Sequence, residues 1–348
     1  MKFHAKPQRF RKGAKKNGSP LLKCTAQMSW IFFNPYGRLR SGWRLTIFLL
    51  LLIVLSIVWE QLVRTLYGFI STYRSIPYPD FLLGLAFRGG LLGLALGVGY
   101  LCAHFLEELP WRSLGASFHK GWFKDFCIGS VVGFAALALA VAVALIGRGV
   151  SFSLNHDWAS VIRSMIGSGV LLVVAAFAEE AMFRGYALQT LARAKLASLG
   201  VILTLALFGI AHLTNPNAVP GFTFANTAIA GLWFAVAYLR TRSLWLPLGL
   251  HWSWNWALGW FFGLPVSGLS VTSHTLLKAS DSGPNWLTGG SYGIEGGVAG
   301  TIALALATIV LWLKPPVSAD PELKKLTSEE NPVTHPSVLS IRPADDHA

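Results

Sequence analysis

Long apolar runs that contain almost no charged residues dominate this sequence and restrict the folds it can adopt. An α-helix rises about 1.5 Å per residue and the hydrocarbon core of a bilayer is about 30 Å thick, so about 20 apolar residues cross it. Eight runs approach or reach this length: Trp43 to Val63, Phe81 to Leu106, Phe126 to Gly147, Ser164 to Phe183, Leu196 to Leu213, Phe222 to Leu239, Ser243 to Gly263 and Gly296 to Leu313. We therefore predict an all-α fold, a polytopic membrane helical bundle with about eight transmembrane helices.

The composition excludes a water-soluble globular protein. Charged residues make up 13% of the 348 residues and apolar residues 53%, whereas soluble domains carry about 25% charged residues. Three cysteines, Cys24, Cys102 and Cys127, lie far apart and form no CxxC pair. We therefore expect neither a disulfide framework nor a zinc knuckle.

The basic residues are unevenly distributed and predict an orientation in the membrane. Lys and Arg occur eleven times before Leu45, and no Asp or Glu occurs in residues 1–59. With eight spans, most of the 29 Lys and Arg residues fall in the two tails and the alternate loops of one side, and Arg88 lies inside the second run. Because cytoplasmic segments carry the excess of Lys and Arg, we predict that both termini are cytoplasmic and that the basic tail lies near anionic lipid. No stacking motif accompanies this tail, so nucleic acid is not the expected partner.

A pair of glutamates ends one of the apolar runs. In "AAFAEEAMFRGYAL", Arg184 follows Glu180 by four residues, so the two side chains share a helix face and can pair. Glu179 points about 100° away around the helix and has no cation nearby in the sequence. This makes Glu179 the candidate reactive carboxylate. The alternative is that both glutamates lie at the membrane surface and serve solubility.

The next run ends in "LFGIAHLTNP" and contributes His212. The segment "TNPNAVPG", Thr214 to Gly221, breaks the helix and turns the chain. If the preceding turn lies near Ala197, Glu180 and His212 are about 25 and 22 Å from it along their helices, and so lie at similar depth. A lone histidine in an apolar helix also serves as an interhelical hydrogen-bonding residue.

The third polar element is "LGLHWSWNWALGW", in which His251 and Asn255 share one helix face. Such a pair makes either a structural clamp or a pair of donors for an oxyanion. We interpret the neighbouring tryptophans as packing or membrane-interface residues. Together with Glu179 and His212, these side chains predict a catalytic or metal site, because ionisable groups in a membrane usually mark a cavity, a partner or a reaction.

These motifs resemble those of the CPBP intramembrane proteases, which include CAAX-processing endopeptidases and the Abi proteins linked to bacteriocin handling. The resemblance rests on "EEAMFR", "FGIAH" and "HWSWN", in the family's order, and covers about residues 165–262. It implies that Glu179 is the base that activates water, that His212 holds this water or helps to bind a metal, and that His251 and Asn255 stabilise the oxyanion. Glu180 and Arg184 are then structural.

A divalent metal, zinc, is an open alternative at the same position. Glu179, His212 and His251 make up a three-ligand set with one position open, and the same groups also suit a bare water. The sequence does not separate the two.

The resulting expectation is an intramembrane endopeptidase that acts on a membrane peptide or protein, of CAAX or bacteriocin type. The alternatives are a non-catalytic membrane immunity or scaffold protein and a small-solute transporter. The predicted organisation is a basic cytoplasmic tail (1–44), N-terminal transmembrane helices (45–163), a CPBP-like catalytic core (164–263), an extracytoplasmic loop (264–295), a last transmembrane helix (296–313) and a polar cytoplasmic tail (314–348). We expect the last tail to be solvated and disordered.

Overall fold

The computed structural model of this protein describes residues 30–73, 75, 79–330, 334 and 339. Much of the predicted basic tail, part of the predicted C-terminal tail and Cys24 lie outside the described residues. The α-helices are α2 (Ser41–Tyr73), α3 (Pro79–Glu107), α4 (Trp122–Ile146), α5 (Trp158–Glu180), α6 (Gln189–Arg193), α7 (Ala197–His212), α8 (Pro220–Thr241), α9 (Trp245–Trp256), α10 (Asn285–Thr288), α11 (Val298–Leu313) and α12 (Pro321–Ser328). The shorter helical segments are η1 (Trp111–Leu114), η2 (Ala181–Leu188), η3 (Ala257–Phe261), η4 (Gly290–Tyr292) and η5 (Ile294–Gly296), of which η2 and η3 are π-helical.

Each of the eight predicted runs coincides with one of these helices, which confirms the polytopic helical bundle. In the described part of the chain, five helical stretches are long and apolar enough to cross a membrane: α2, α3, α4, the continuous stretch Trp158–Arg193, and α8. The helices α7 and α11 are apolar but shorter. The number eight and the cytoplasmic placement of both termini stay predictions.

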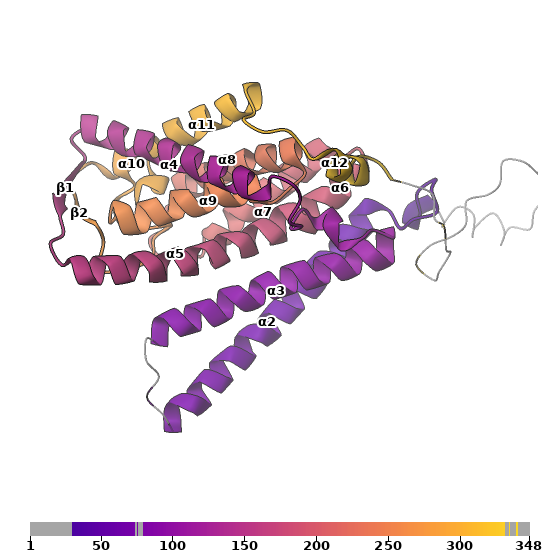
Figure 1. Cartoon of the computed structure of the whole chain (residues 1–348), viewed down its shortest axis with the longest axis horizontal. Helices are drawn as coiled ribbons and strands as arrows, with labels where there is room; N and C mark the ends of the chain where they lie inside the picture. Colours follow the sequence, from indigo (N-terminus) through magenta and orange to yellow (C-terminus); the bar gives the residue numbers. More distant parts are fainter. Residues whose placement is uncertain (1–29, 74, 76–78, 331–333, 335–338, 340–348) are drawn as a thin grey trace, which may run out of the picture.

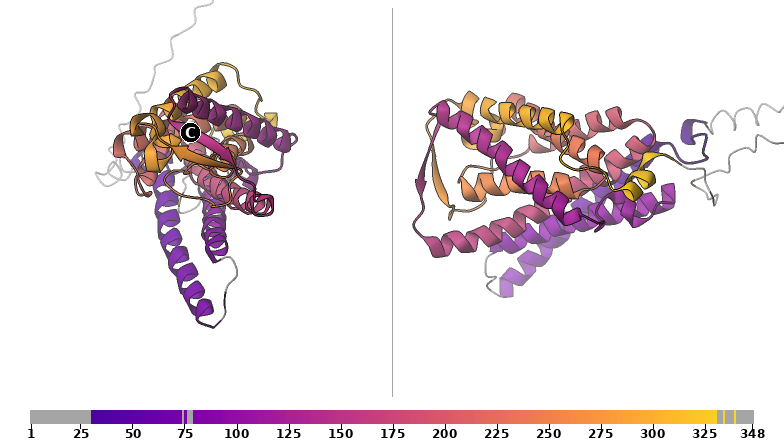
Figure 2. Two further views of the ribbon diagram at one scale, coloured as in Figure 1. Left: turned by 90° about the vertical axis from the view of Figure 1, so that its left-hand side faces the viewer. Right: turned by 45° about the horizontal axis from the view of Figure 1, so that its top comes forward.

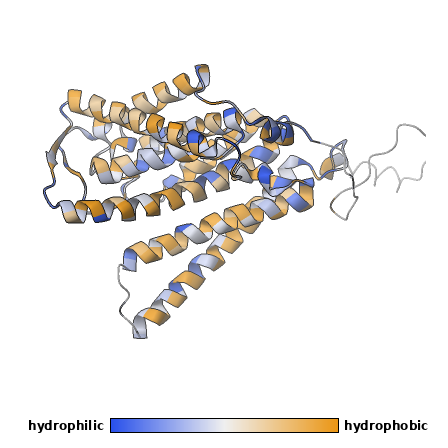
Figure 3. Cartoon of the chain, in the orientation of Figure 1, coloured by the Kyte–Doolittle hydropathy of each residue, from blue (hydrophilic) through white to orange (hydrophobic). Residues whose placement is uncertain are grey.

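The outer faces of the helices are apolar, as contact with lipid requires. On α2, Leu50, Ile53, Val54 and Ile57 are each more than half exposed, and Figure 3 shows apolar residues along most of α2, α3 and α5. Water would make such a surface an aggregation site. A bilayer removes this cost because its hydrocarbon is as apolar as the side chains.

The helices α2 and α3 form a hairpin that diverges from the rest of the bundle (Figures 1 and 2). Gly90 of α3 makes the hairpin close, because a Cβ there would lie 1.9 Å from the Trp59 indole. The Trp59 Nε1–H also donates to the Ala86 carbonyl at 3.2 Å. The α3 helix continues alongside α5, so it supplies a wall of the site described below.

The helices that carry the site begin and end at signals in the sequence. Asp157 caps α5, since its carboxylate accepts the Ser160 N–H at 3.2 Å, and hydrogen bonds from Ser160 lower the pKa of Asp157. The helix α7 ends at His212, and α8 begins at Pro220, where a proline needs no N–H partner. The predicted turn between these two helices is confirmed.

Glycines bring α4 and α9 into close contact. A Cβ on Gly129 would lie 2.4 Å from the Leu246 carbonyl oxygen, and one on Gly249 would lie 2.2 Å from the Phe126 carbonyl oxygen. Gly133, one turn along from Gly129, packs on Leu250. Small residues four apart allow membrane helices to approach each other closely. This contact fixes the face of α9 that bears the "HWSWN" motif.

Three tryptophans join α9 and η3 to α5. The Nε1–H groups of Trp252, Trp256 and Trp260 donate to the carbonyl oxygens of Gly169, Met165 and Val161 at 3.1, 3.2 and 3.1 Å. The rings stack on one another, with centroids 5.4 and 4.8 Å apart. The interpretation as packing residues is confirmed for Trp252 and Trp256, whereas Trp254 lines the cavity of the candidate site. The ladder holds the glutamate helix against the histidine helix.

We expect Trp256→Phe to lower the free energy of unfolding by about 1 kcal/mol, because it removes one indole hydrogen bond and keeps an aromatic ring. Thermal unfolding in detergent measures this effect. Trp286→Phe is the matched control, since Trp286 is 57% exposed. Equal effects of the two substitutions would contradict the role of the ladder.

A two-stranded sheet and the helix α12 differ from what the sequence predicts. The strands β1 (Val150–Leu154) and β2 (Leu277–Asp281) pair antiparallel, so the loops carry a small sheet within the helical fold. The tail after Lys314 was expected to be disordered, and this is wrong for α12. Asp320 caps this helix and Leu323 is fully buried, so one apolar face provides enough packing to order it.

Candidate functional site

The two glutamates lie where α5 changes into the π-helical segment η2. π-Helical turns are frequent at functional sites. The Glu180 side chain is fully buried, whereas that of Glu179 is 16% exposed. Neighbouring carboxylates therefore have different surroundings, and the interpretation of both as surface residues is wrong for Glu180.

Glu180 is held by two partners. Its Oε1 lies 3.1 Å from Arg184 Nη1, as the spacing predicted, and also accepts from His251 Nδ1 at 2.9 Å. The guanidinium of Arg184 donates to the Gly231 carbonyl at 3.0 Å and lies over the rings of Phe208 and other aromatic residues. Glu180 thus orients a histidine on α9 as well as pairing within its own helix.

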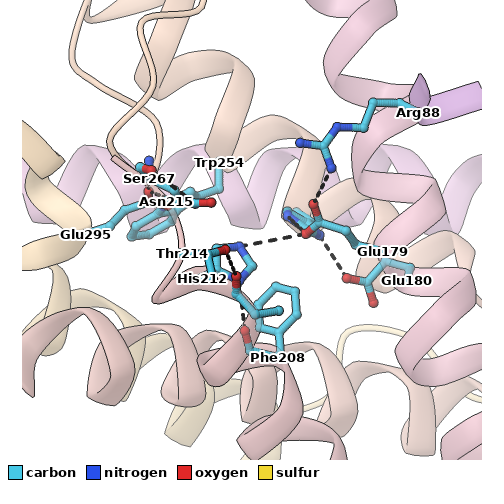
Figure 4. Close-up of polar contacts among 12 residues, drawn as sticks. Arg88, Glu179, Glu180, Phe208, His212, Thr214, Asn215, Trp254, Ser267 and Glu295 are labelled. Carbon is cyan, nitrogen blue, oxygen red and sulfur yellow. Dashed lines mark hydrogen bonds and ion pairs between the residues drawn. The ribbon is translucent and has the colours of Figure 1, made fainter. Parts of the chain in front are cut away.

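Glu179 faces both histidines and an arginine, and Figure 4 shows it between His212 and Arg88. Its Oε2 lies 3.7 Å from His251 Nε2 and 4.0 Å from His212 Nε2. Its Oε1 lies 3.6 Å from Nη1 of Arg88 on α3. The sequence identified no cation near Glu179, and tertiary packing supplies one from a different helix.

Hydrogen bonds fix the orientation of the two imidazoles. His212 Nδ1 lies 2.8 Å from the Phe208 carbonyl oxygen, and His251 Nδ1 lies 2.9 Å from Glu180 Oε1. Both partners accept hydrogen bonds, so we assign the proton to Nδ1 in each ring. Both Nε2 atoms then point at Glu179, and a neutral ring presents a lone pair there.

A cavity of about 100 Å³ adjoins these groups, large enough for several water molecules. Glu179, His212, His251 and Asn255 all line it, so the four predicted catalytic side chains share one space. The other polar lining residues are Arg88, Asn215, Asn226, Thr227, Ser267 and Glu295. The remaining wall is apolar, with Leu172, Ala175, Ala230, Val266, Leu269, Val271 and Leu304 among its residues.

The predicted extracytoplasmic loop contributes residues to the wall of the cavity. Glu295 accepts from Trp254 Nε1 at 2.8 Å and from the backbone N–H and hydroxyl of Ser267 at 2.7 and 2.8 Å. Asn215 donates to the Ser267 carbonyl at 3.1 Å. Burial raises the pKa of the loop residue Tyr292 to about 12, so its phenol is neutral at physiological pH. No local pattern predicts these contacts, because they join segments that are far apart in the sequence.

Arg88 is a further lining residue to which the sequence analysis assigns no role. It lies about 14 Å along α3 from Pro79, at 1.5 Å per residue. A lone arginine inside an apolar run is itself a signal of a functional site, and this signal was available in the sequence.

The donor set suits zinc in its chemistry and less well in its geometry. A carboxylate and two imidazoles with engaged Nδ1 atoms are common zinc ligands. Among the described residues, however, no group of three or more His, Cys, Asp or Glu side chains has the spacing for a metal ion. A water molecule held by hydrogen bonds does not require this spacing, and zinc on Glu179, His212 and His251 stays a prediction.

The fold and the site together define a class: an integral membrane protein in which a carboxylate and two histidines line one cavity. Residues 161–257 match the family model of the type II CAAX prenyl endopeptidases, described as Rce1-like. The match includes all three motifs and confirms the predicted resemblance. The chain is also 26% identical over 158 residues to the uncharacterized protein YyaK of Bacillus subtilis, covering 44% of this chain and 52% of YyaK. The match thus spans about half the length of this curated relative.

Proposed function

We propose that this protein is an intramembrane endopeptidase that hydrolyses a peptide bond with a water molecule activated by Glu179. The observation that carries the proposal is the convergence of one carboxylate oxygen with two imidazole Nε2 atoms beside a cavity within an apolar bundle. Amide hydrolysis in a membrane requires a water-filled space, a base and donors for the oxyanion. The four lining side chains supply each of these.

Glu179 and His212 hold the attacking water. Their Oε2 and Nε2 atoms lie 4.0 Å apart, a separation that one water spans with two hydrogen bonds of about 2.8 Å. The water oxygen attacks the substrate carbonyl carbon as its proton passes to Glu179. Glu179 then gives this proton to the amide nitrogen, the C–N bond breaks, and a carboxylic acid and an amine are released.

His251 and Asn255 stabilise the oxyanion of the tetrahedral intermediate. The Nδ1 atom of His251 is held by the buried Glu180 carboxylate, so Nε2 faces the site, where it donates to the oxyanion when it carries a proton. The Asn255 amide lines the same cavity and is the second donor. Glu180 therefore acts as a positioning residue in this mechanism.

The substrate class follows from the site and from the family match. The cavity lies within the bundle, so the substrate is a membrane-associated peptide or protein. The matched family is named for CAAX prenyl endopeptidases, so a prenylated C-terminal peptide is the first substrate to test, and a bacteriocin-type peptide is the second.

The experiment that tests the proposal identifies membrane peptides that accumulate when the Glu179→Gln form replaces the native protein. Synthetic copies of these peptides are then incubated with the purified native protein, with and without a chelator. We expect cleavage in both conditions, because the mechanism uses water held by protein groups. Loss of cleavage with the chelator, restored by zinc, would favour the metal alternative. Absence of any cleavage would overturn the proposed function and favour a scaffold or immunity protein.

A further inference from the structure

Arg88 is the one Lys or Arg among the described residues that line the cavity. Its side chain is 39% exposed and reaches the cavity from α3, on the side of Glu179 away from Glu180 (Figure 4). Arg88 takes no part in the proposed activation of water or in the stabilisation of the oxyanion.

The guanidinium of Arg88 has spare hydrogen-bonding capacity. It carries five N–H donors, and its ion-pair contact with Glu179 is 3.6 Å long, beyond a normal hydrogen bond. Arg184 differs, because it donates both to Glu180 and to the Gly231 carbonyl. A cation within a membrane helix is costly unless an anion or a water-filled cavity stabilises it. The fully buried Arg184 therefore has hydrogen-bond partners within the protein. Arg88, which is accessible beside the cavity, has N–H groups that can donate to a ligand.

We propose that Arg88 determines specificity by binding a carboxylate of the peptide substrate close to the scissile bond. This inference rests on the proposed function. Guanidinium and carboxylate groups pair through two parallel hydrogen bonds, and five donors allow Arg88 to keep its contact with Glu179 as well.

The position of Arg88 limits where the carboxylate lies in the substrate. The attacking water adjoins Glu179, and Arg88 Nη1 is 3.6 Å from that carboxylate. An extended peptide advances about 3.3 Å per residue, so the anion lies within about three residues of the bond that is cut. It is either the free C-terminal carboxylate or an Asp or Glu side chain in these positions.

The test compares synthetic copies of the accumulating peptide that differ only in charge. One copy ends in a carboxylate and one in a carboxamide, and a further pair exchanges any Asp or Glu near the cut for Asn or Gln. We expect the native protein to cleave one charged form with a kcat/KM at least about tenfold higher than its neutral counterpart. The pair that shows the difference identifies the source of the carboxylate.

Variants connect this preference with Arg88. In Arg88→Gln the charged and neutral peptides are expected to react at similar rates, and Arg88→Lys should restore part of the preference. Arg64→Gln is the matched control, because Arg64 is exposed and pairs with Glu60 on α2; it should keep the full preference. Since the peptide comparison on the native protein requires no variant, misfolding of Arg88→Gln does not block the test.

The possible outcomes distinguish failure of the role proposed for Arg88 from failure of the proposed peptidase function. Cleavage without any preference for the charged peptides overturns the role of Arg88 and leaves the peptidase intact. A preference that persists in Arg88→Gln also overturns it. No cleavage of any peptide by the native protein overturns the proposed function, and the role of Arg88 falls with it.

Discussion

Glu179→Gln is expected to reduce kcat for peptide cleavage by about 10²- to 10⁴-fold, the usual contribution of a positioned general base. Glutamine has nearly the same shape as glutamate but cannot accept the proton of the attacking water. Glu179 lines the cavity, so we expect the substitution to slow the chemical step and to leave folding intact. Initial rates with the purified protein in liposomes measure it, and thermal unfolding shows whether the variant is folded.

Glu60→Gln is the control for this substitution. Glu60 is 50% exposed and pairs with Arg64 on the surface of α2, away from the cavity, so its loss should leave kcat unchanged. Cleavage by purified Glu179→Gln at the native rate would remove the assigned base. A fall in KM together with kcat would point instead to a change in how the substrate binds.

The sequence predicts the helices well because their signal is local. A run such as Phe126 to Gly147 has the length and composition of a spanning helix, and α4 occupies nearly the same residues. The pairing of Glu180 with Arg184 is predictable for the same reason, since four residues along a helix bring two side chains together. The break at Thr214 to Gly221 depends only on proline, asparagine and glycine chemistry.

The missed features depend on contacts between distant segments. The bond from His251 to Glu180 requires the register between α5 and α9, which the tryptophan ladder and the glycine contacts with α4 set. No spacing within one motif reveals it. Arg88 reaches Glu179 only because α3 packs beside α5, and Glu295 reaches Trp254 through an irregular loop.

The buried pair of Glu180 and Arg184 is the second place where a single substitution should have a large effect. Both side chains are fully buried, and the cost of removing charges from water is offset only by their mutual attraction and hydrogen bonds. Arg184→Met removes the cation and leaves the Glu180 carboxylate in an apolar environment with His251 as its remaining partner. We expect this variant to lose about 3–5 kcal/mol of unfolding free energy, as measured for other broken buried pairs.

The double variant Glu180→Gln with Arg184→Met separates the stranded charge from simple loss of packing. It removes both charges and keeps similar side-chain volumes, so it should be more stable than Arg184→Met alone. Denaturant unfolding in detergent compares the variants, with Arg64→Met as the control at an exposed arginine. If the double variant is no more stable than Arg184→Met, the cost lies in the lost contacts of the guanidinium with Gly231 and the aromatic rings rather than in the unpaired carboxylate. Activity provides a second criterion. Glu180→Gln removes the carboxylate that orients His251, so we expect kcat to fall in this single variant. The double variant carries the same change, so its kcat should also fall although its stability recovers.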